Sequence, residues 1–157
     1  MGGVIIMKIF IILILSINLI YAEDRHYKSY VPWETDSIFV AWLIKRYVDK
    51  NAVFSTVPKP QKIDKEYAIN TSNSKMRRSS RFTAFEAAVR IYNINDLCID
   101  KLKPVIRILE MTPWRKHEDM NSFRFEEGIV KLFPKESGIQ SLEKAFTYID
   151  KYCDIKK

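Results

Sequence analysis

The stretch "DSIFVAWLIKRYVDKNAVFSTVP", residues 36–58, predicts a helix that is followed directly by a strand. Thr35 or Asp36 can cap the helix, in which apolar residues recur at helical spacing. The cations Lys45 and Arg46 come near its C-terminal end, where positive charge complements the helix dipole. The residues expected on its buried face are Ile38, Phe39, Trp42 and Leu43.

The segments before and after this helix in the sequence are expected to form one small sheet. Residues 52–58, "AVFSTVP", read as a short strand that is ended by Pro58 and Pro60. The preceding segment 26–37, "HYKSYVPWETDS", reads as an extended lead-in. The regions around Val31 and Val53 would then form the sheet, although the sequence does not give the strand order.

The rest of the chain is mostly helical. Thr83 and Glu86 form a capping box that starts one helix, and Ser137 and Gln140 form a second that starts the last helix. Between them we expect a helix over residues 97–111, kinked or divided at Pro104, and another from about Ser122 to Phe133. At 157 residues, the chain predicts one α+β domain with four to five helices and a small sheet.

Residues 1–22 have the layout of a secretory signal. One cation, Lys8, precedes the apolar run 9–20, and the small residue Ala22 precedes a charged segment. The run is shorter than the ~20 residues that span a bilayer. We expect cleavage after Ala22 and a mature domain over residues 23–157 in the periplasm, without a stable membrane span. An uncleaved signal anchor, and a start at Met7 instead of Met1, remain open.

The charge of the chain suggests anionic partners. Formal net charge is +7, and removal of residues 1–22, which hold one lysine and no carboxylate, leaves +6. A basic exported protein can favour anionic lipid headgroups, wall polymers or small oxyanions. Nucleic acid is not expected as a partner, because export takes the protein away from it. Whether the chain has a protein partner, and its oligomeric state, cannot be read from the sequence.

Cysteine and histidine are too sparse to predict a metal site. The two cysteines, Cys98 and Cys153, fall on apolar helix faces and can pair in an oxidising compartment, but the unpaired state is equally open. The two histidines, His26 and His117, lie far apart. We expect no metal and no cofactor. A phosphate-binding glycine loop and a glycine-flanked nucleophilic serine are also missing, so the motifs name no reaction.

The stretch "KMRRSSRFTAFE", residues 75–86, is the one local cluster with a physical mechanism. Its four cations immediately precede the helix that starts at Thr83; they are Lys75, Arg77, Arg78 and Arg81. A helix start leaves backbone amides unpaired, and its dipole favours an anion. The cluster is therefore a candidate anion site. The alternative is a solvated basic loop, which the residues alone favour because charge runs are common in loops.

Residues 36–58 resemble the signature of the chromate resistance exported proteins, the unit that also forms the carboxy-terminal domain of chromate resistance protein B. The matching positions are Asp36, Trp42, Leu43, Ile44, Lys45, Arg46, Asp49, Phe54, Val57 and Pro58. The resemblance extends from Trp33 and Glu34 to about Gly128. It implies cleft residues at Trp33, Asp36, Trp42, Lys45, Arg46, Asn70, Glu86 and Glu110.

Four positions depart from the family pattern. An aspartate of the family is Asn70 here, a histidine is Arg78, and a His-Asp pair falls on Arg107 and Ile108. These exchanges remove groups that would bind a metal or move a proton. They add cations, which suits an anion site better than a cation site.

The resemblance implies a contribution to chromate resistance by sensing, binding or handling the oxyanion outside the cytoplasm. Two other classes of function are open. One is an enzyme of unknown reaction whose degenerate cleft holds Asp36, Lys45, Arg46 and Glu110. The other is a non-catalytic secreted protein with a structural or partner-binding role. We expect binding rather than catalysis.

Overall fold

A β-α-β unit forms the first half of the fold. The computed structural model describes residues 25–132 and 139–154, starting with β1 (His26–Tyr30). The helix α2 (Thr35–Leu43), a π-helical turn η1 (Ile44–Val48) and β2 (Val53–Val57) follow. β1 and β2 are parallel, with His26 opposite Val53 and Tyr30 opposite Val57. A parallel pair needs a crossover, which α2 and η1 supply. The expected small sheet is confirmed.

β1 is bordered on both sides. On the edge away from β2, the Lys28 amide donates to the Tyr67 carbonyl at 2.9 Å, and the Ile69 amide donates to the Lys28 carbonyl at 2.9 Å. A single parallel bridge joins Lys28 to Ala68 there. The first strand of the domain is therefore held between β2 and the segment 67–69.

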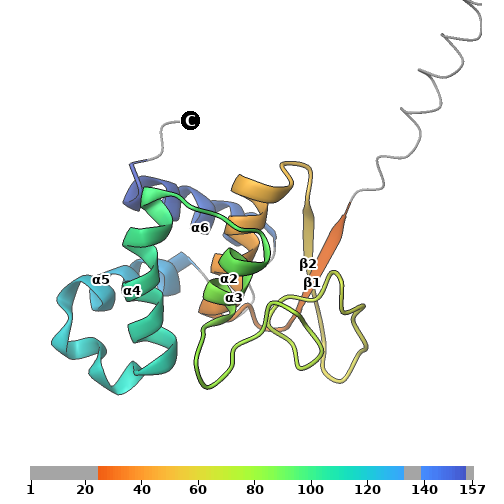
Figure 1. Ribbon diagram of the computed structural model, residues 1–157, viewed down its shortest axis with the longest axis horizontal. Coiled ribbons are helices and arrows are strands. Elements are labelled where there is room, and N and C mark those ends of the chain that lie inside the picture. Colours follow the sequence, from red (N-terminus) through yellow and green to blue (C-terminus); the bar gives the residue numbers. More distant parts are fainter. Residues whose placement is uncertain (1–24, 133–138, 155–157) are drawn as a thin grey trace, which may run out of the picture.

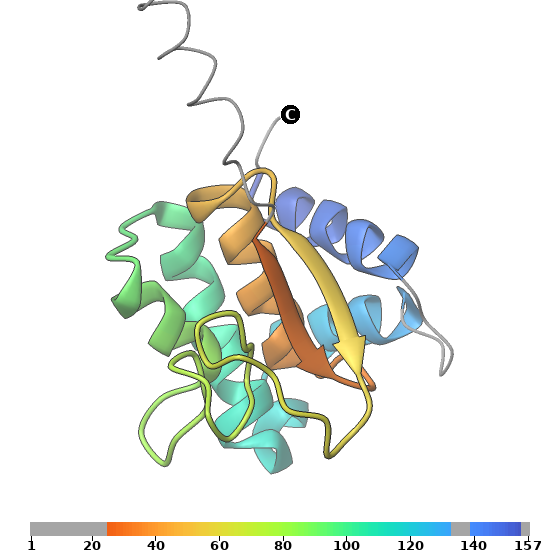
Figure 2. The same ribbon diagram turned by 90° about the vertical axis from the view of Figure 1, so that its right-hand side faces the viewer.

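α2 is buried all round rather than on one face. Every residue from Asp36 to Leu43 is buried, including Val40 and Ala41, which the sequence pattern did not place inward. The reason is its central position: α3, α4 and α6 pack against it, and the two strands lie in front of it in Figure 2. A helix with neighbours on all sides needs apolar residues on all sides.

Four more α-helices follow in the described part of the chain, where five are found in all. They are α3 (Ala84–Ile91), α4 (Leu97–Met111), α5 (Met120–Leu132) and α6 (Ile139–Tyr152), with a 3-10 helix η2 (Pro113–Glu118) before α5. Figure 1 shows the strands at one side, α4 and α5 at the other, and α2 and α3 between them. None of the helices in these residues is long and apolar enough to cross a membrane.

Two details of the helices differ from the sequence-based expectations. α4 runs through Pro104 as one helix, so the alternative of a division at Pro104 is wrong. The carbonyl that loses its helical donor there belongs to Asp100, which is exposed, so water can satisfy it. Residues 113–118 form a 3-10 helix, and α5 starts at Met120 rather than near Ser122. The expected signal over residues 1–22, the helix end at Phe133 and the cap at Ser137 lie outside the described residues.

A disulfide joins the start of α4 to the end of α6. Cys98 and Cys153 are bonded, with their Cα atoms 5.1 Å apart, and both are buried. The buried hydrophobic residues of the described part of the chain all lie between Tyr27 and Cys153. The protein from residue 23 onward therefore contains every one of these core residues.

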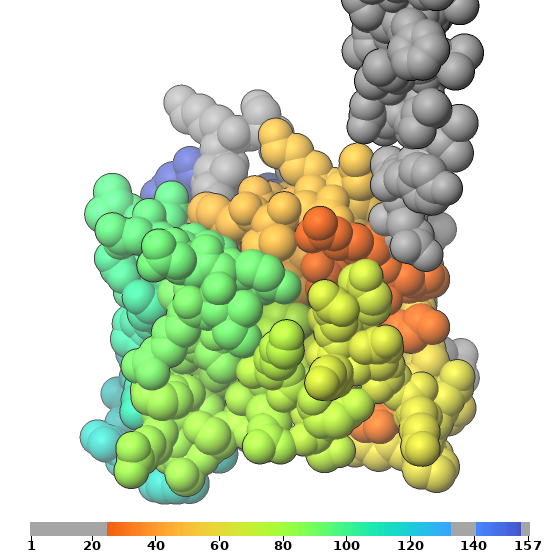
Figure 3. Space-filling model, turned by 45° about the vertical axis from the view of Figure 1, so that its right-hand side comes forward, coloured from red at the N-terminus to blue at the C-terminus, as the bar shows by residue number. Residues whose placement is uncertain are grey.

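The segment between β2 and α3, residues 58–83, contains no regular helix or strand. In the space-filling view of Figure 3, its yellow to green atoms spread over one face between the strands and the later helices. A bridge between Ile69 and Met76 and the buried Ile63, Ala68 and Thr71 hold it against the body. This segment carries the basic stretch.

Candidate functional site

Asp36 joins the starts of two helices. It lies in the first turn of α2 and is fully buried, and its carboxylate accepts from the backbone amides of α3: Ala84 N–H to Oδ2 at 2.7 Å and Phe85 N–H to Oδ1 at 2.9 Å. The expectation that Asp36 or Thr35 caps α2 is therefore wrong, since the N-cap of α2 is Glu34. Asp36 instead accepts hydrogen bonds from the first backbone amides of α3.

The start of α3 has no amide left for a ligand among its first three. The capping box is present, with the Glu86 amide donating to Thr83 Oγ1 at 3.0 Å and the Thr83 amide donating to Glu86 Oε2 at 2.9 Å. Ala84 and Phe85 donate to Asp36. The unpaired amides expected behind the basic stretch are thus occupied by side chains of the protein itself. An anion site nearby must rely on the arginines.

Glu110 lies beside this junction, at the end of α4. Its carboxylate accepts from the Arg78 guanidinium at 2.8 Å, and the same guanidinium also donates to the Glu110 carbonyl at 3.1 Å. Its side chain is 13% exposed. The chain therefore brings two buried or mostly buried carboxyls together, and the Arg78 charge acts on both of them.

Burial sets the proton affinity of both carboxyls. Burial raises the pKa of Asp36 to about 6, against the two α3 amides and Arg78, which lower it. Burial, followed by the Asp36 and Glu34 charges, raises the pKa of Glu110 to about 7, while Arg78 acts in the opposite direction. Asp36 and Glu110 can thus bind and release protons near neutral pH, where ordinary carboxyl groups have already lost theirs.

Two of the four basic residues line one concavity, which we call the Arg77–Arg78 groove. Its volume is about 380 Å³, and Glu34, the segment 70–72 and the segment 77–79 line it. Arg77 donates to the Ser72 carbonyl, and Arg78 reaches Glu110. Each guanidinium has five N–H donors, so these contacts leave donors for a ligand. Both cations are exposed.

Asn70 fixes the wall of this groove. It adopts a left-handed backbone conformation with φ 49°, which asparagine tolerates better than most residues. Its side-chain oxygen accepts from the Arg78 amide at 3.2 Å, and its side-chain nitrogen donates to Glu34 Oε2 at 3.3 Å. Asn70 therefore connects the arginine loop to the start of α2.

Arg81 and Lys75 are exposed and are not among the residues that line the groove. The Arg81 carbonyl accepts from Arg107 at 3.2 Å, and Arg107 also pairs with Glu86 at 2.8 Å. The four cations predicted as one site thus divide, and only Arg77 and Arg78 share a concavity.

The eight cleft residues implied by the resemblance also divide. Asp36, Asn70, Glu86 and Glu110 lie around the starts of α2 and α3, as described above. Trp42, Lys45 and Arg46 lie at the far end of α2 and in η1. Arg46 comes ten positions after Asp36, roughly 15 Å along a helix. Trp33 is half-buried against the core. The enzyme hypothesis needed Asp36, Lys45, Arg46 and Glu110 in one cleft, which this arrangement does not provide.

Asp150 organises the far end. Its Oδ1 accepts from Trp42 Nε1 at 2.8 Å and from Arg46 Nε at 2.9 Å, and its Oδ2 accepts from Arg46 Nη2 at 2.7 Å. Lys45 donates to the Ala52 carbonyl at 2.9 Å. Sequence reasoning missed Asp150. The available signal was an acid next to Ile149 within the buried stripe of the last helix.

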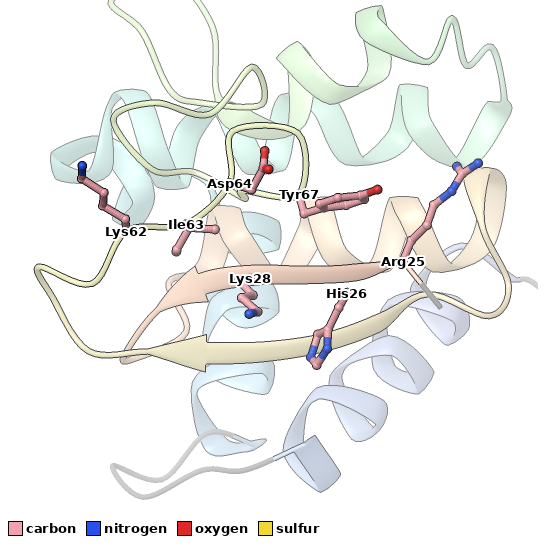
Figure 4. Close-up of a pocket in the computed structure, with 7 residues that line it drawn as sticks. All are labelled: Arg25, His26, Lys28, Lys62, Ile63, Asp64 and Tyr67. Carbon is pink, nitrogen blue, oxygen red and sulfur yellow. The ribbon is translucent and has the colours of Figure 1, made fainter. Parts of the chain in front are cut away.

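A second cavity lies between β1 and the segment 62–67. Its volume is about 230 Å³, and its cations are Arg25, Lys28 and Lys62. Figure 4 shows Arg25 and Lys62 at opposite ends of this cavity, with Lys28 between them on β1. These cations do not converge on a point, so this cavity is a weaker anion site than the Arg77–Arg78 groove.

Within the ranges that the structure describes, no group of three or more histidine, cysteine, aspartate or glutamate side chains is arranged to hold a metal ion. His26 and His117 are both exposed. The chemistry that the described site offers is therefore hydrogen bonding and charge from arginine, hydroxyl and carboxyl groups.

Comparison with known proteins identifies the family of the chain. A family model described as "ChrB, C-terminal domain" matches residues 30–155. No curated protein and no solved structure matches the chain. The matched range includes Asp36, Glu110 and the whole Arg77–Arg78 groove.

Proposed function

Because the chain belongs to the ChrB C-terminal domain family, we propose that it is an exported protein that binds a small oxyanion such as chromate in the Arg77–Arg78 groove. By doing so it contributes to chromate resistance outside the cytoplasm. The observation that carries the proposal is the placement of two arginines in one concavity. Arginine suits a tetrahedral oxyanion, because its parallel N–H donors can reach two oxygens at once.

Hydroxyl groups add to the donors of the groove. Ser79 Oγ accepts from the Arg81 amide at 3.2 Å and from the Phe82 amide at 3.1 Å. A hydroxyl that accepts twice still has its own hydrogen to donate. Ser79 lines the groove, so this hydrogen can reach an oxygen of the ligand. The groove therefore supports an oxyanion with charged and neutral donors.

Two features support export. The disulfide between Cys98 and Cys153 is of a kind that persists in oxidising compartments such as the periplasm. The chain also begins with the signal-like segment 1–22, which precedes the described body. Fractionation of cells that express the protein tests export. The protein should be found outside the cytoplasm with residues 1–22 removed. A full-length protein in the cytoplasm would contradict this part of the proposal.

Calorimetry with chromate tests binding. The protein from residue 23 onward should take up chromate, and Arg77→Ala should weaken binding by about tenfold or more, the value of one charge-assisted hydrogen bond. Arg77 is the sharper variant, because its removal leaves the Arg78–Glu110 pair intact. Arg78→Ala should weaken binding further. Arg124→Ala, an exposed cation on α5, is the matched control and should bind as the wild type does.

Heat equal to the buffer dilution in the wild type would overturn the proposal and favour the partner-binding interpretation. Equal affinity in the wild type and in both groove variants would show that chromate binds elsewhere.

A further inference from the structure

The Arg77–Arg78 groove contains a carboxylate as well as cations. Glu34 lines it together with both arginines. Although Glu34 is the N-cap residue of α2, its side chain makes no capping hydrogen bond to that helix. Glu34 is exposed, and its carboxylate contacts Asn70, another residue that lines the groove. In a site that accepted any anion, a negative charge at this place would only weaken binding.

Asn70 holds this carboxylate in place. Its side-chain oxygen accepts from the Arg78 amide, and this contact leaves its side-chain nitrogen to donate to Glu34 Oε2 at 3.3 Å. Asn70 thus links the Glu34 carboxylate to the backbone of Arg78. The site presents donors from Arg77, Arg78 and Ser79, together with a carboxylate acceptor.

We propose that Glu34 makes the groove selective for oxyanions that keep a hydrogen, such as hydrogen phosphate or hydrogen chromate, over fully deprotonated oxyanions such as sulfate. This inference rests on the proposed function, because it concerns the same groove. A ligand with an O–H group donates to Glu34 while its other oxygens accept from the arginines. Sulfate has no hydrogen to donate, so it faces the carboxylate with like charge and without a hydrogen bond.

Titration of inorganic phosphate and sodium sulfate tests the selectivity. Both anions are titrated calorimetrically into the protein at pH 7 and equal ionic strength, because sulfate keeps no proton at this pH and phosphate keeps at least one. The wild type should bind phosphate about tenfold more tightly than sulfate, the value of one charge-assisted hydrogen bond. Glu34→Gln keeps the shape and removes the charge, and it should bring the ratio close to one, mainly by tighter sulfate binding.

Glu127→Gln is the matched control, since Glu127 is an exposed carboxylate on α5 and its loss changes the net charge by the same amount. It should leave the ratio as in the wild type. Equal affinity for both anions in the wild type, or an unchanged ratio in Glu34→Gln, would overturn the selectivity and leave the anion site standing. Failure of both anions to bind would overturn this inference, whereas the proposed function stands or falls with the chromate titration described above.

Discussion

Replacing Glu110 with glutamine is expected to stabilise the protein at pH 8 and to change its stability by less than about 1 kcal/mol at pH 5. Burial and the neighbouring Asp36 and Glu34 charges raise the pKa of Glu110 from 4.5 to about 7, in spite of Arg78. The folded protein therefore holds this proton more tightly than the unfolded chain does. The resulting stability is fully present below pH 4.5 and is lost as the pH rises through about 7.

The size of the effect follows from this change. Between 4.5 and about 7, at 1.36 kcal/mol per pH unit, ionisation of Glu110 costs the folded state about 3 kcal/mol. Glutamine does not ionise and keeps an oxygen that can accept from Arg78. The variant should thus exceed the wild type by up to about 3 kcal/mol at pH 8. Because burial also raises the pKa of Asp36, to about 6, a smaller decline with pH should remain in the variant.

Urea denaturation followed by tryptophan fluorescence at pH 5, 6.5 and 8 measures these differences in the protein from residue 23 onward. Glu118→Gln is the control, because its side chain is 65% exposed and its pairing with Arg115 should contribute under about 1 kcal/mol. A Glu110→Gln variant that is less stable than the wild type at pH 8, or a difference that does not change with pH, would refute the reasoning.

Two further predictions concern the far side of the fold. Changing both Cys98 and Cys153 to alanine should lower the free energy of unfolding by about 4 kcal/mol, because the disulfide closes a loop with a sequence separation of 55. Urea denaturation with and without reductant measures this. Reductant should lower the free energy of unfolding of the wild type by the same amount and should not change that of the variant. Asp150→Ala should cost about 3 to 5 kcal/mol, because it leaves the half-buried Arg46 guanidinium without its carboxylate, whereas the exposed Asp154→Ala should cost less than about 1 kcal/mol in the same assay.

Local signals in the sequence predicted the elements of the fold well. The capping box of Thr83 and Glu86 starts α3 as expected, because both partners lie within one turn. The strand at Val53 and the helix before it follow from periodicity that can be read over a few residues. Each of these depends on contacts between near neighbours in the chain.

Contacts between distant residues could not be read in the same way. The capping rule placed Asp36 at its own helix, but its carboxylate binds the amides of Ala84 and Phe85, which are 48 and 49 positions away. The sequence placed Arg46 near a helix end, where its charge complements the dipole, but its guanidinium binds Asp150 at a separation of 104. A sequence pattern shows which side chains need a partner, but only the packing of the helices decides which partner they find.

The central place of β1 also limits where proteolysis can act without harm. Lys28 bonds to the segment 67–69 on one edge of β1, and the strand pairs with β2 on the other. A protease that removed residues beyond Arg25 would therefore remove the strand to which both β2 and the segment 67–69 are hydrogen-bonded. The cut after Ala22 that we propose would leave all of β1 in place.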